Sequence, residues 1–290
     1  MVEDGAADLE ALSAGIYPST GRASTIGMTG APGVGKSTLA TELVRAERAA
    51  ERTVAVLAID PTSPYTGGAL LGDRVRMQEH ATDPGVFIRS MATRGHLGGM
   101  ALAAPEAVRV LDAAGYDEVV VETVGVGQAE VEVAAATDTA VVVLAPGMGD
   151  AVQMAKAGIL EIADVFVVNK ADRDGAGDVV RELRQMLHLG AARPWDPPIL
   201  RTSALRHEGL DDLRAAVAEH RAFLSGSGAL QAKRRARLLR EVESLAAARF
   251  RVRAAMALTT DGALADELVA RRLDPYRAAA MLADETAVTG

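Results

Sequence analysis

A phosphate-binding signature, G-x-x-x-x-G-K-S, occupies residues 30–37 of the chain. Its glycines let successive backbone N–H groups turn toward an anion, its lysine can reach the β- and γ-phosphates of a nucleotide, and its serine can ligate Mg²⁺. A short β-like run at residues 24–28 and helical spacing of apolar residues at 38–44 supply the strand and helix that the signature requires. We therefore expect phosphate binding by Gly30, Ala31, Pro32, Gly33, Val34, Gly35, Lys36, Ser37 and Thr38.

Acidic residues stand where predicted strands end, which is where ligands bind in an open α/β sheet. Asp60 and Glu122 each close an apolar run, and carboxylates in such places can hold Mg²⁺ or its water ligands. Asp73, across the loop that follows Asp60, is a weaker candidate for the same metal ion. A carboxylate that only caps the next turn is the alternative for Asp60. Gly125 is placed to offer its backbone N–H to a γ-phosphate.

A second signature, Asn169-Lys170-Ala171-Asp172, follows another apolar run and has the form of a guanine-reading element. The Asp172 carboxylate can accept hydrogen bonds from the N1–H and the exocyclic amine of guanine, whereas adenine presents the wrong pattern there. Lys170 can lie along the base, and Asn169 can tie this loop to the phosphate-binding loop. The backbone of Ser203, Ala204 and Leu205, after the next predicted strand, is placed to contact guanine O6. The two signatures together predict that the bound nucleotide is GTP or GDP.

Three other polar residues in predicted loops have open roles. Arg94 is a candidate for an arginine finger supplied by the chain itself. Gln128 either orients a water molecule or faces solvent, and His96 is interpreted as an ordinary loop residue because no second metal ligand is suitably spaced. No glutamine directly follows Gly125. We therefore expect slow intrinsic GTP hydrolysis that a partner accelerates.

Composition sets the class of protein. Of the 290 residues 49% are hydrophobic but only 3% aromatic, which favours a core of aliphatic strands and alanine-rich helices. The net charge of −8 argues against general nucleic-acid binding. Cysteine is absent, which excludes disulfides, and no apolar run approaches the ~20 residues of a membrane span. We expect a cytoplasmic protein that binds neither membranes nor nucleic acid.

The pattern of apolar runs predicts an α/β fold: a P-loop NTPase with a mostly parallel sheet of about seven strands, flanked by helices and followed by a C-terminal helical extension. Residues 1–24 are predicted to form a short, loosely held arm and residues 25–224 the nucleotide-binding domain. A Ser/Gly linker at residues 225–228 precedes helices in residues 229–290, whose apolar stripes must pack on the sheet domain or on a second copy. The basic run within residues 233–240 is interpreted as a solvated face.

Several stretches between about residues 25 and 285 resemble the MeaB/ArgK GTPases: the phosphate-binding loop, Asp60-Pro-Thr-Ser-Pro, Gly67-Gly68, Leu71-Gly72-Asp73, Glu122-Thr-Val-Gly-Val-Gly-Gln128, Asn169-Lys-Ala-Asp172 and Asp274-Pro-Tyr276. The resemblance implies a homodimeric G protein, paired through its C-terminal helices, that chaperones an adenosylcobalamin-dependent acyl-CoA mutase, chiefly methylmalonyl-CoA mutase. It also implies that Lys36, Glu122 and Asp73 take part in catalysis and that residues 146–156 are a switch that responds to the mutase. Family members usually have a longer helical region ahead of the phosphate-binding loop.

Two other functions stay open. Some relatives carry an older label as kinases of a lysine/arginine/ornithine transport system, and a P-loop kinase would transfer phosphate to a protein or small molecule instead of water. A metallochaperone GTPase of the nickel-insertion type is the other alternative. It ranks lower because that class usually needs Cys or His clusters, and this chain has no Cys and five scattered His.

Overall fold

The computed structural model describes residues 8–60, 77–80, 82–92, 103–123, 129–147, 159–190, 192–260 and 262–288. A seven-stranded sheet, in the order β3-β2-β4-β1-β5-β6-β7, forms its centre, and every paired strand is parallel. The predicted α/β fold is therefore confirmed. The strands are β1 (Ser24–Thr29), β2 (Val54–Asp60), β3 (Val86–Ala92), β4 (Glu118–Thr123), β5 (Thr139–Leu144), β6 (Val165–Val168) and β7 (Ile199–Arg201).

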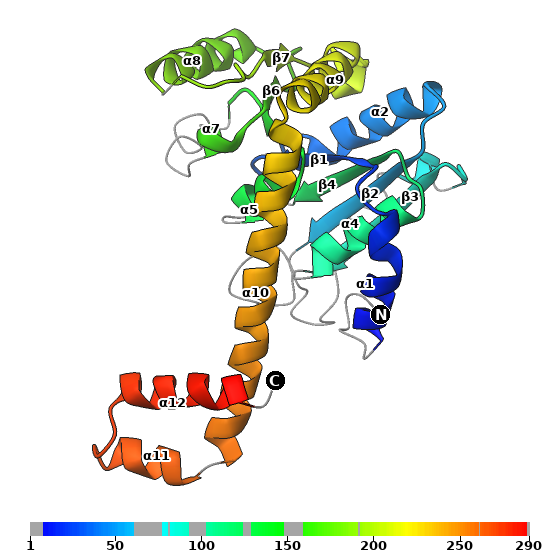
Figure 1. Ribbon diagram of the computed structural model, residues 1–290. Coiled ribbons are helices and arrows are strands. Elements are labelled where there is room, and N and C mark those ends of the chain that lie inside the picture. The colour runs from blue at the N-terminus through cyan, green and yellow to red at the C-terminus, as the bar shows by residue number, and fades with distance from the viewer. Residues whose placement is uncertain are drawn as a thin grey trace. The chain divides into compact units, whose positions relative to one another are not determined.

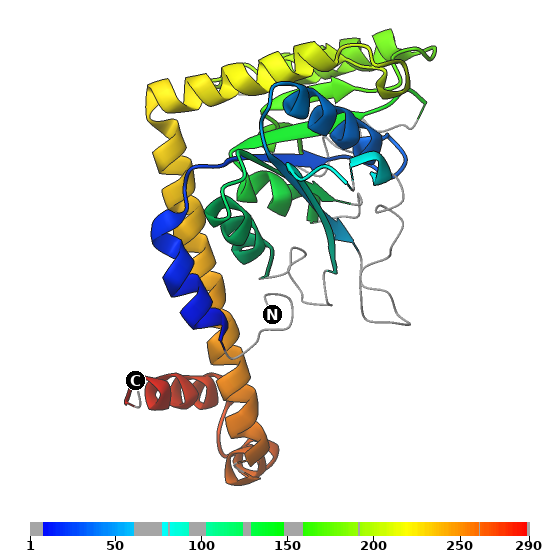
Figure 2. The same ribbon diagram turned by 90° about the vertical axis from the view of Figure 1, so that its right-hand side faces the viewer.

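Helices cover both faces of the sheet (Figures 1 and 2). On one face Val54 and Val56 of β2 pack with α2 and α9, and on the other Ala55 and Leu57 pack with α4 and α5. A strand buried on both faces needs apolar residues at every position, which explains the continuous aliphatic runs of the sequence. The helices around the sheet are α1 (Leu9–Ile16), α2 (Lys36–Ala49), α4 (Ala103–Ala113), α5 (Ala129–Ala136), α7 (Ile159–Ile162), α8 (Ala176–Leu189) and α9 (Leu210–Ser227), with short 3-10 helices at Tyr17–Ser19, Gln78–His80 and Ala204–Arg206.

The sequence suggested that the chain ahead of β1 is loosely held, but the residues just before β1 are bonded to α4. Asp112 of α4 accepts hydrogen bonds from three consecutive amides, those of Gly21, Arg22 and Ala23. The distances to the Arg22 and Ala23 nitrogens are 3.1 and 2.8 Å. A carboxylate 89 to 91 residues away in sequence gives no local signal, because the pairing exists only once the sheet and α4 are formed.

The Ser/Gly linker predicted at residues 225–228 is wrong, since α9 continues through it to Ser227. Gly228, with φ of 74°, ends α9, and α10 (Ala229–Thr260) begins at the next residue. Lys233 donates to the Asp138 carbonyl and to Asp164, while Arg234 donates to both Asp138 carboxylate oxygens. Two members of the predicted solvated basic run are thus ion-paired with the sheet domain.

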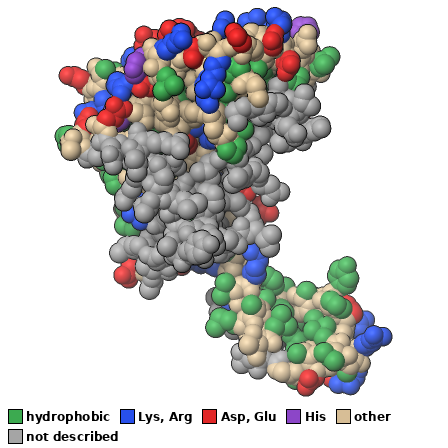
Figure 3. Space-filling view, turned by 180° about the vertical axis from the view of Figure 1, so that it is seen from behind, with side chains coloured by type: hydrophobic (Ala, Val, Ile, Leu, Met, Phe, Trp, Pro, Cys, Tyr) green, Lys and Arg blue, Asp and Glu red, His purple; other side chains and the backbone are tan. Residues whose placement is uncertain are grey.

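The structure divides into two compact units, Met1–Arg234 and Arg235–Gly290. The second contains most of α10 with α11 (Gly262–Val269) and α12 (Pro275–Val288). Asp274 Oδ1 accepts hydrogen bonds from the amides of Tyr276 and Arg277, so Asp274 caps the N-terminus of α12. Among the described residues of this unit, Leu264, Ala278 and Leu282 form a small buried apolar cluster. Hydrophobic side chains, coloured green, are visible on the face of this unit that Figure 3 shows. Among the described residues, no helix has the length and apolarity needed to cross a membrane.

Two buried carboxylates, Glu47 of α2 and Glu118 at the start of β4, share one arginine beneath the sheet. Arg52 Nη1 lies 2.7 Å from Glu47 and 3.4 Å from Glu118, and Glu47 also pairs with Arg214. Burial, followed by repulsion from Glu47, raises the pKa of Glu118 from 4.5 to about 7, although Arg52, Arg221 and Arg214 oppose the shift. Between pH 4.5 and about 7, Glu118 is therefore mostly protonated in the folded protein and mostly ionised in the unfolded chain.

Stability should consequently fall as pH rises through this window, by up to about 3 kcal/mol from this one group. We expect Glu118→Gln to remove that part of the pH dependence and to raise the free energy of unfolding at pH 8, with less effect at pH 5. Urea unfolding at the two pH values measures it, with the exposed Glu219→Gln as the matched control. A Glu118→Gln variant with the same pH dependence as the wild type contradicts the assignment.

Candidate nucleotide site

The phosphate-binding loop joins the end of β1 to the start of α2, at the carboxyl edge of the sheet. Gly30 has φ of 143°, and a Cβ there would lie 2.1 Å from the carbonyl oxygen of Val143 on β5. Gly35, with φ of 96°, would place a Cβ 2.4 Å from Asn169 Nδ2. Both positions therefore require glycine, because neighbouring strands and loops approach the loop backbone too closely for a side chain.

Lys36 is the first residue of α2, and its side chain folds back over the loop that precedes it. Its ammonium donates to the carbonyl oxygens of Gly30 and Ala31, at 2.7 and 3.0 Å. The first-turn amides of α2 lack helical acceptors and carry the positive end of the helix dipole toward the same loop. The arrangement provides a buried positive charge and backbone donors, which is what a polyphosphate requires.

The structure brings together Ser37 and Glu122, which are 85 residues apart in sequence. The Ser37 hydroxyl donates to Glu122 Oε1 at 2.6 Å, and both side chains are buried. Register explains the approach, because β4 pairs with β1 and sets Glu122 opposite Met28, just before the phosphate-binding loop. A hydroxyl and a carboxylate are hard oxygen donors of the kind that Mg²⁺ accepts beside nucleotide phosphates, so these residues fit that ion.

The other predicted metal and γ-phosphate residues are only partly described. Asp60 ends β2, and its neighbour Ile59 pairs with Thr123 of β4, so the Asp60 backbone lies at the edge of the sheet where Glu122 is found. Asp73, Arg94, His96, Gly125 and Gln128 lie outside the described residues, as do residues 148–156 of the predicted switch.

The residues predicted to read guanine converge on the phosphate-binding loop from β6 and β7. Asn169 Nδ2 donates to the Val34 carbonyl at 2.9 Å, and Lys170 Nζ donates to the Gly33 carbonyl at 2.5 Å. Asn169 Oδ1 accepts from the Ala204 amide at 3.2 Å. Asn169 therefore joins three loops that are remote in sequence, as the sequence had suggested for two of them.

Asp172 lies beside the loop of residues 203–208, and Ser203 Oγ donates to its Oδ1 at 2.7 Å. The pKa of Asp172 is lowered, chiefly by this hydrogen bond, so the carboxylate is ionised and able to accept at neutral pH. Ser203 and Glu208 exchange backbone hydrogen bonds that close the loop. Leu205, at the exposed tip, has 79% of its side chain accessible.

Two nearby residues were not predicted from the sequence. Glu42 is buried on α2, and His207 extends from the loop of residues 203–208 to meet it. The signal for Glu42 was an acidic residue set among the apolar positions Leu39, Leu43 and Val44. For His207 there was no signal, because only the folded loop places it against α2.

The parallel sheet, the phosphate-binding loop after β1 and the Asn-Lys-x-Asp element after β6 define a P-loop nucleotide-binding protein. Residues 2–258 match the family described as methylmalonyl Co-A mutase-associated GTPase MeaB. The chain belongs to this family and is a GTPase.

Individual relatives agree with this assignment. A protein of Pyrococcus abyssi is 49% identical over 276 residues, which cover 93% of this chain and 85% of that one. GTPase ArgK of Escherichia coli is 40% identical over 221 residues, covering 74% of this chain and 67% of that one. The crystal structure of an LAO/AO transport system kinase has a TM-score of 0.68 and 27% identity, covering 96% of this chain and 86% of that one.

Proposed function

We propose that this GTPase acts as a chaperone for an adenosylcobalamin-dependent acyl-CoA mutase, methylmalonyl-CoA mutase or a relative, and hydrolyses GTP as part of that role. The observation that carries the nucleotide assignment is the position of Asn169, which joins the base-reading loops to the phosphate-binding loop. The association with a mutase is supported by the description of the family, which names methylmalonyl Co-A mutase.

The chemistry we propose is in-line attack of water on the γ-phosphate, with most of the catalysis supplied by charge and position. Lys36 lies where its ammonium can move from the Gly30 and Ala31 carbonyls to phosphate oxygens. Ser37 and Glu122 would hold Mg²⁺, which supplies positive charge to the β- and γ-phosphates. Asp60 and Asp73 are proposed to complete the surroundings of the metal and of the attacking water. Asp172 is proposed to select guanine, and the loop that begins with Ser203, Ala204 and Leu205 is proposed to lie against the base. In the structure the Ser203 and Ala204 amides donate to the Glu208 carbonyl and to Asn169 Oδ1.

Stimulated hydrolysis is the test of this proposal. We expect the purified protein to hydrolyse GTP slowly, ATP negligibly, and GTP faster when the mutase of the same organism is added. A partner that supplies one arginine to the transition state accelerates such a reaction on the order of 10³ to 10⁵. Phosphate release with each nucleotide, with and without the mutase, measures it. Tight GTP binding without any stimulation of hydrolysis by the mutase would mean that the protein is a GTPase but that this mutase is not its partner.

The second candidate is a kinase, which the description of the structurally similar transport system kinase favours. A kinase moves the γ-phosphate to a hydroxyl or nitrogen of a second substrate, so the released inorganic phosphate would fall short of the GTP consumed. Equal amounts of GDP and inorganic phosphate favour hydrolysis.

A homodimer formed through the C-terminal helices is also proposed. Several large apolar side chains of the second unit are exposed, and its own buried cluster is small. Burial of these side chains against a second copy would stabilise a dimer. They are Leu239, Val242, Val252, Met256, Val269 and Tyr276. A sedimentation mass of twice the 30.1 kDa chain supports the pairing, and a monomer at micromolar concentration contradicts it.

A further inference from the structure

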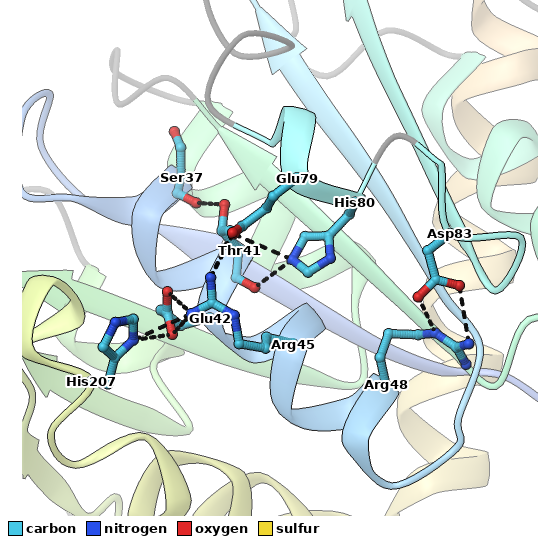
Figure 4. Close-up of polar contacts among 9 residues, drawn as sticks. All are labelled: Ser37, Thr41, Glu42, Arg45, Arg48, Glu79, His80, Asp83 and His207. Carbon is cyan, nitrogen blue, oxygen red and sulfur yellow. Dashed lines mark hydrogen bonds and ion pairs between the residues drawn. The ribbon is translucent and has the colours of Figure 1, made fainter.

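Glu42 is the centre of a polar network on the outer side of α2, shown in Figure 4. Its side chain is only 6% exposed, although the residues around it reach solvent. Arg45 Nη1 lies 2.5 Å from both Glu42 oxygens, and His207 Nδ1 lies 2.7 Å from Oε2. A carboxylate buried this far must keep its partners, because an unpaired buried charge is costly.

His207 belongs to the loop of residues 203–208, whose other end meets the predicted guanine site. At that end Ser203 contacts Asp172, and the Ala204 amide contacts Asn169. The intervening residues form a single 3-10 turn, after which His207 adopts φ of 58°. A non-glycine residue in this conformation is held by its contacts, and the His207 side chain contacts Glu42 and Arg45.

Gly209, two residues after His207, brings the end of the loop close to the backbone of β7. A Cβ there would lie 2.2 Å from the Arg201 carbonyl, so the backbone crosses β7 at close range. The loop is thus attached to the sheet at its base, to the Asn169 and Asp172 side chains at its start, and to α2 at its tip. The side chain of His207 links the loop to the helix that begins at Lys36, through its contacts with Glu42 and Arg45.

Arg45 extends the same network to another part of the chain. Its Nη2 donates to both oxygens of Glu79 in the 3-10 helix Gln78–His80, at 2.8 and 2.7 Å. Arg45 and Glu79 are each more than 40% exposed, so water and salt screen this pair. Glu42 is 6% exposed and His207 is 61% exposed, so the contact between them is shielded from water on the Glu42 side only.

We propose that Glu42 is a positioning residue for guanine recognition: it holds His207 and thereby keeps the loop of residues 203–208 against the base. The inference rests on the proposed function, because it requires that this loop contacts guanine. Glu42 does not touch the nucleotide in this account. Its effect passes through His207, so it concerns affinity for the base and not affinity for the phosphates.

Two ligands separate these effects. GDP engages both the base and the phosphate sites, whereas inorganic tripolyphosphate engages only the phosphate-binding loop. We expect His207→Ala to weaken GDP binding roughly tenfold and Glu42→Gln to weaken it less, since a glutamine retains one acceptor. Both variants should bind tripolyphosphate as the wild type does. Isothermal titration of the full chain with each ligand gives the ratio of the two dissociation constants.

Three further variants sharpen the test. His207→Gln keeps a donor for Glu42 and should restore part of the GDP affinity lost in His207→Ala. The double variant Glu42→Gln/His207→Ala should bind GDP about as His207→Ala does, because both substitutions affect the same contact, the one between Glu42 and His207. Glu79→Gln removes the same charge from the same network at its far end, and should leave the ratio unchanged.

Equal losses for GDP and tripolyphosphate, or additive losses in the double variant, would overturn the positioning role. Unchanged GDP affinity in His207→Ala would overturn it as well. The failure of the proposed function looks different: the wild-type protein would then bind ADP as tightly as GDP. In that case both the guanine assignment and the role of Glu42 are wrong.

Discussion

We expect Lys36→Met to hydrolyse GTP roughly 10²- to 10³-fold more slowly than the wild type, which is the usual cost of losing one preorganised donor at a developing negative charge. Lys36 is 5% exposed, and its ammonium lies over the phosphate-binding loop. Methionine fills a similar volume without the charge. Single-turnover hydrolysis with saturating GTP measures the chemical step apart from binding.

Folding must be checked separately for this variant. The midpoint of thermal unfolding without nucleotide, compared with that of the wild type, shows whether loss of the bonds to the Gly30 and Ala31 carbonyls disturbs the fold. A variant with an unchanged melting temperature and a hydrolysis rate within threefold of the wild type would exclude Lys36 from catalysis.

The second large effect is expected from Asp172→Asn, which should weaken GTP binding roughly 10²-fold and admit xanthosine nucleotides. The carboxylate accepts two donors of guanine, whereas an asparagine amide presents a donor where one acceptor is needed. Xanthine has a carbonyl in place of the exocyclic amine, so it suits the asparagine. Competition of GTP, XTP and ATP against a fluorescent nucleotide measures the preference.

Asp174→Asn is the matched control, because Asp174 is exposed two residues further along the same turn and makes the same change of charge. It should keep the preference for GTP. Unaltered selectivity in Asp172→Asn would mean that another part of the chain reads the base.

Strands β2, β5 and β6 were predictable because each is a nearly continuous aliphatic run. Strands buried on both faces leave a strong pattern that needs no tertiary information. The same holds for the cap of α12, where Asp274 and Pro275 are a local signal.

Contacts between distant residues were predictable only where a signature implied a ligand that both residues touch. Ser37 and Glu122 were assigned to one metal ion and lie 2.6 Å apart, whereas the contact of Glu42 with His207 serves no shared ligand and left no trace in the sequence. Asp112 and its three amides are a similar case. Pairings of this kind depend on topology, and no short-range pattern encodes them.

The misjudged boundary near residue 225 has a physical reason. Ser and Gly are poor helix formers, but Leu224 and Val217 of α9 pack on the sheet domain and carry the helix past its weak end. The composition of residues 225–228 reflects a local preference against helix, and the packing of α9 outweighs that preference.

Lys233 and Arg234 attach the first part of α10 to the sheet domain, whereas the rest of α10 belongs to the second unit. The first turn and a half of the helix is bonded to Asp138, Asp164 and the carbonyls of Gly21 and Ala23, so it belongs to the cooperative folding unit of the sheet. Amide hydrogens in that stretch should exchange with solvent at the pace of β5 and β6, and those further along α10 at a pace of their own. The border between the two compact units therefore falls inside an unbroken helix, just after Arg234. A nucleotide-binding fragment cut at Gly228 would lose the Lys233 and Arg234 side chains, which pair with Asp164 and Asp138.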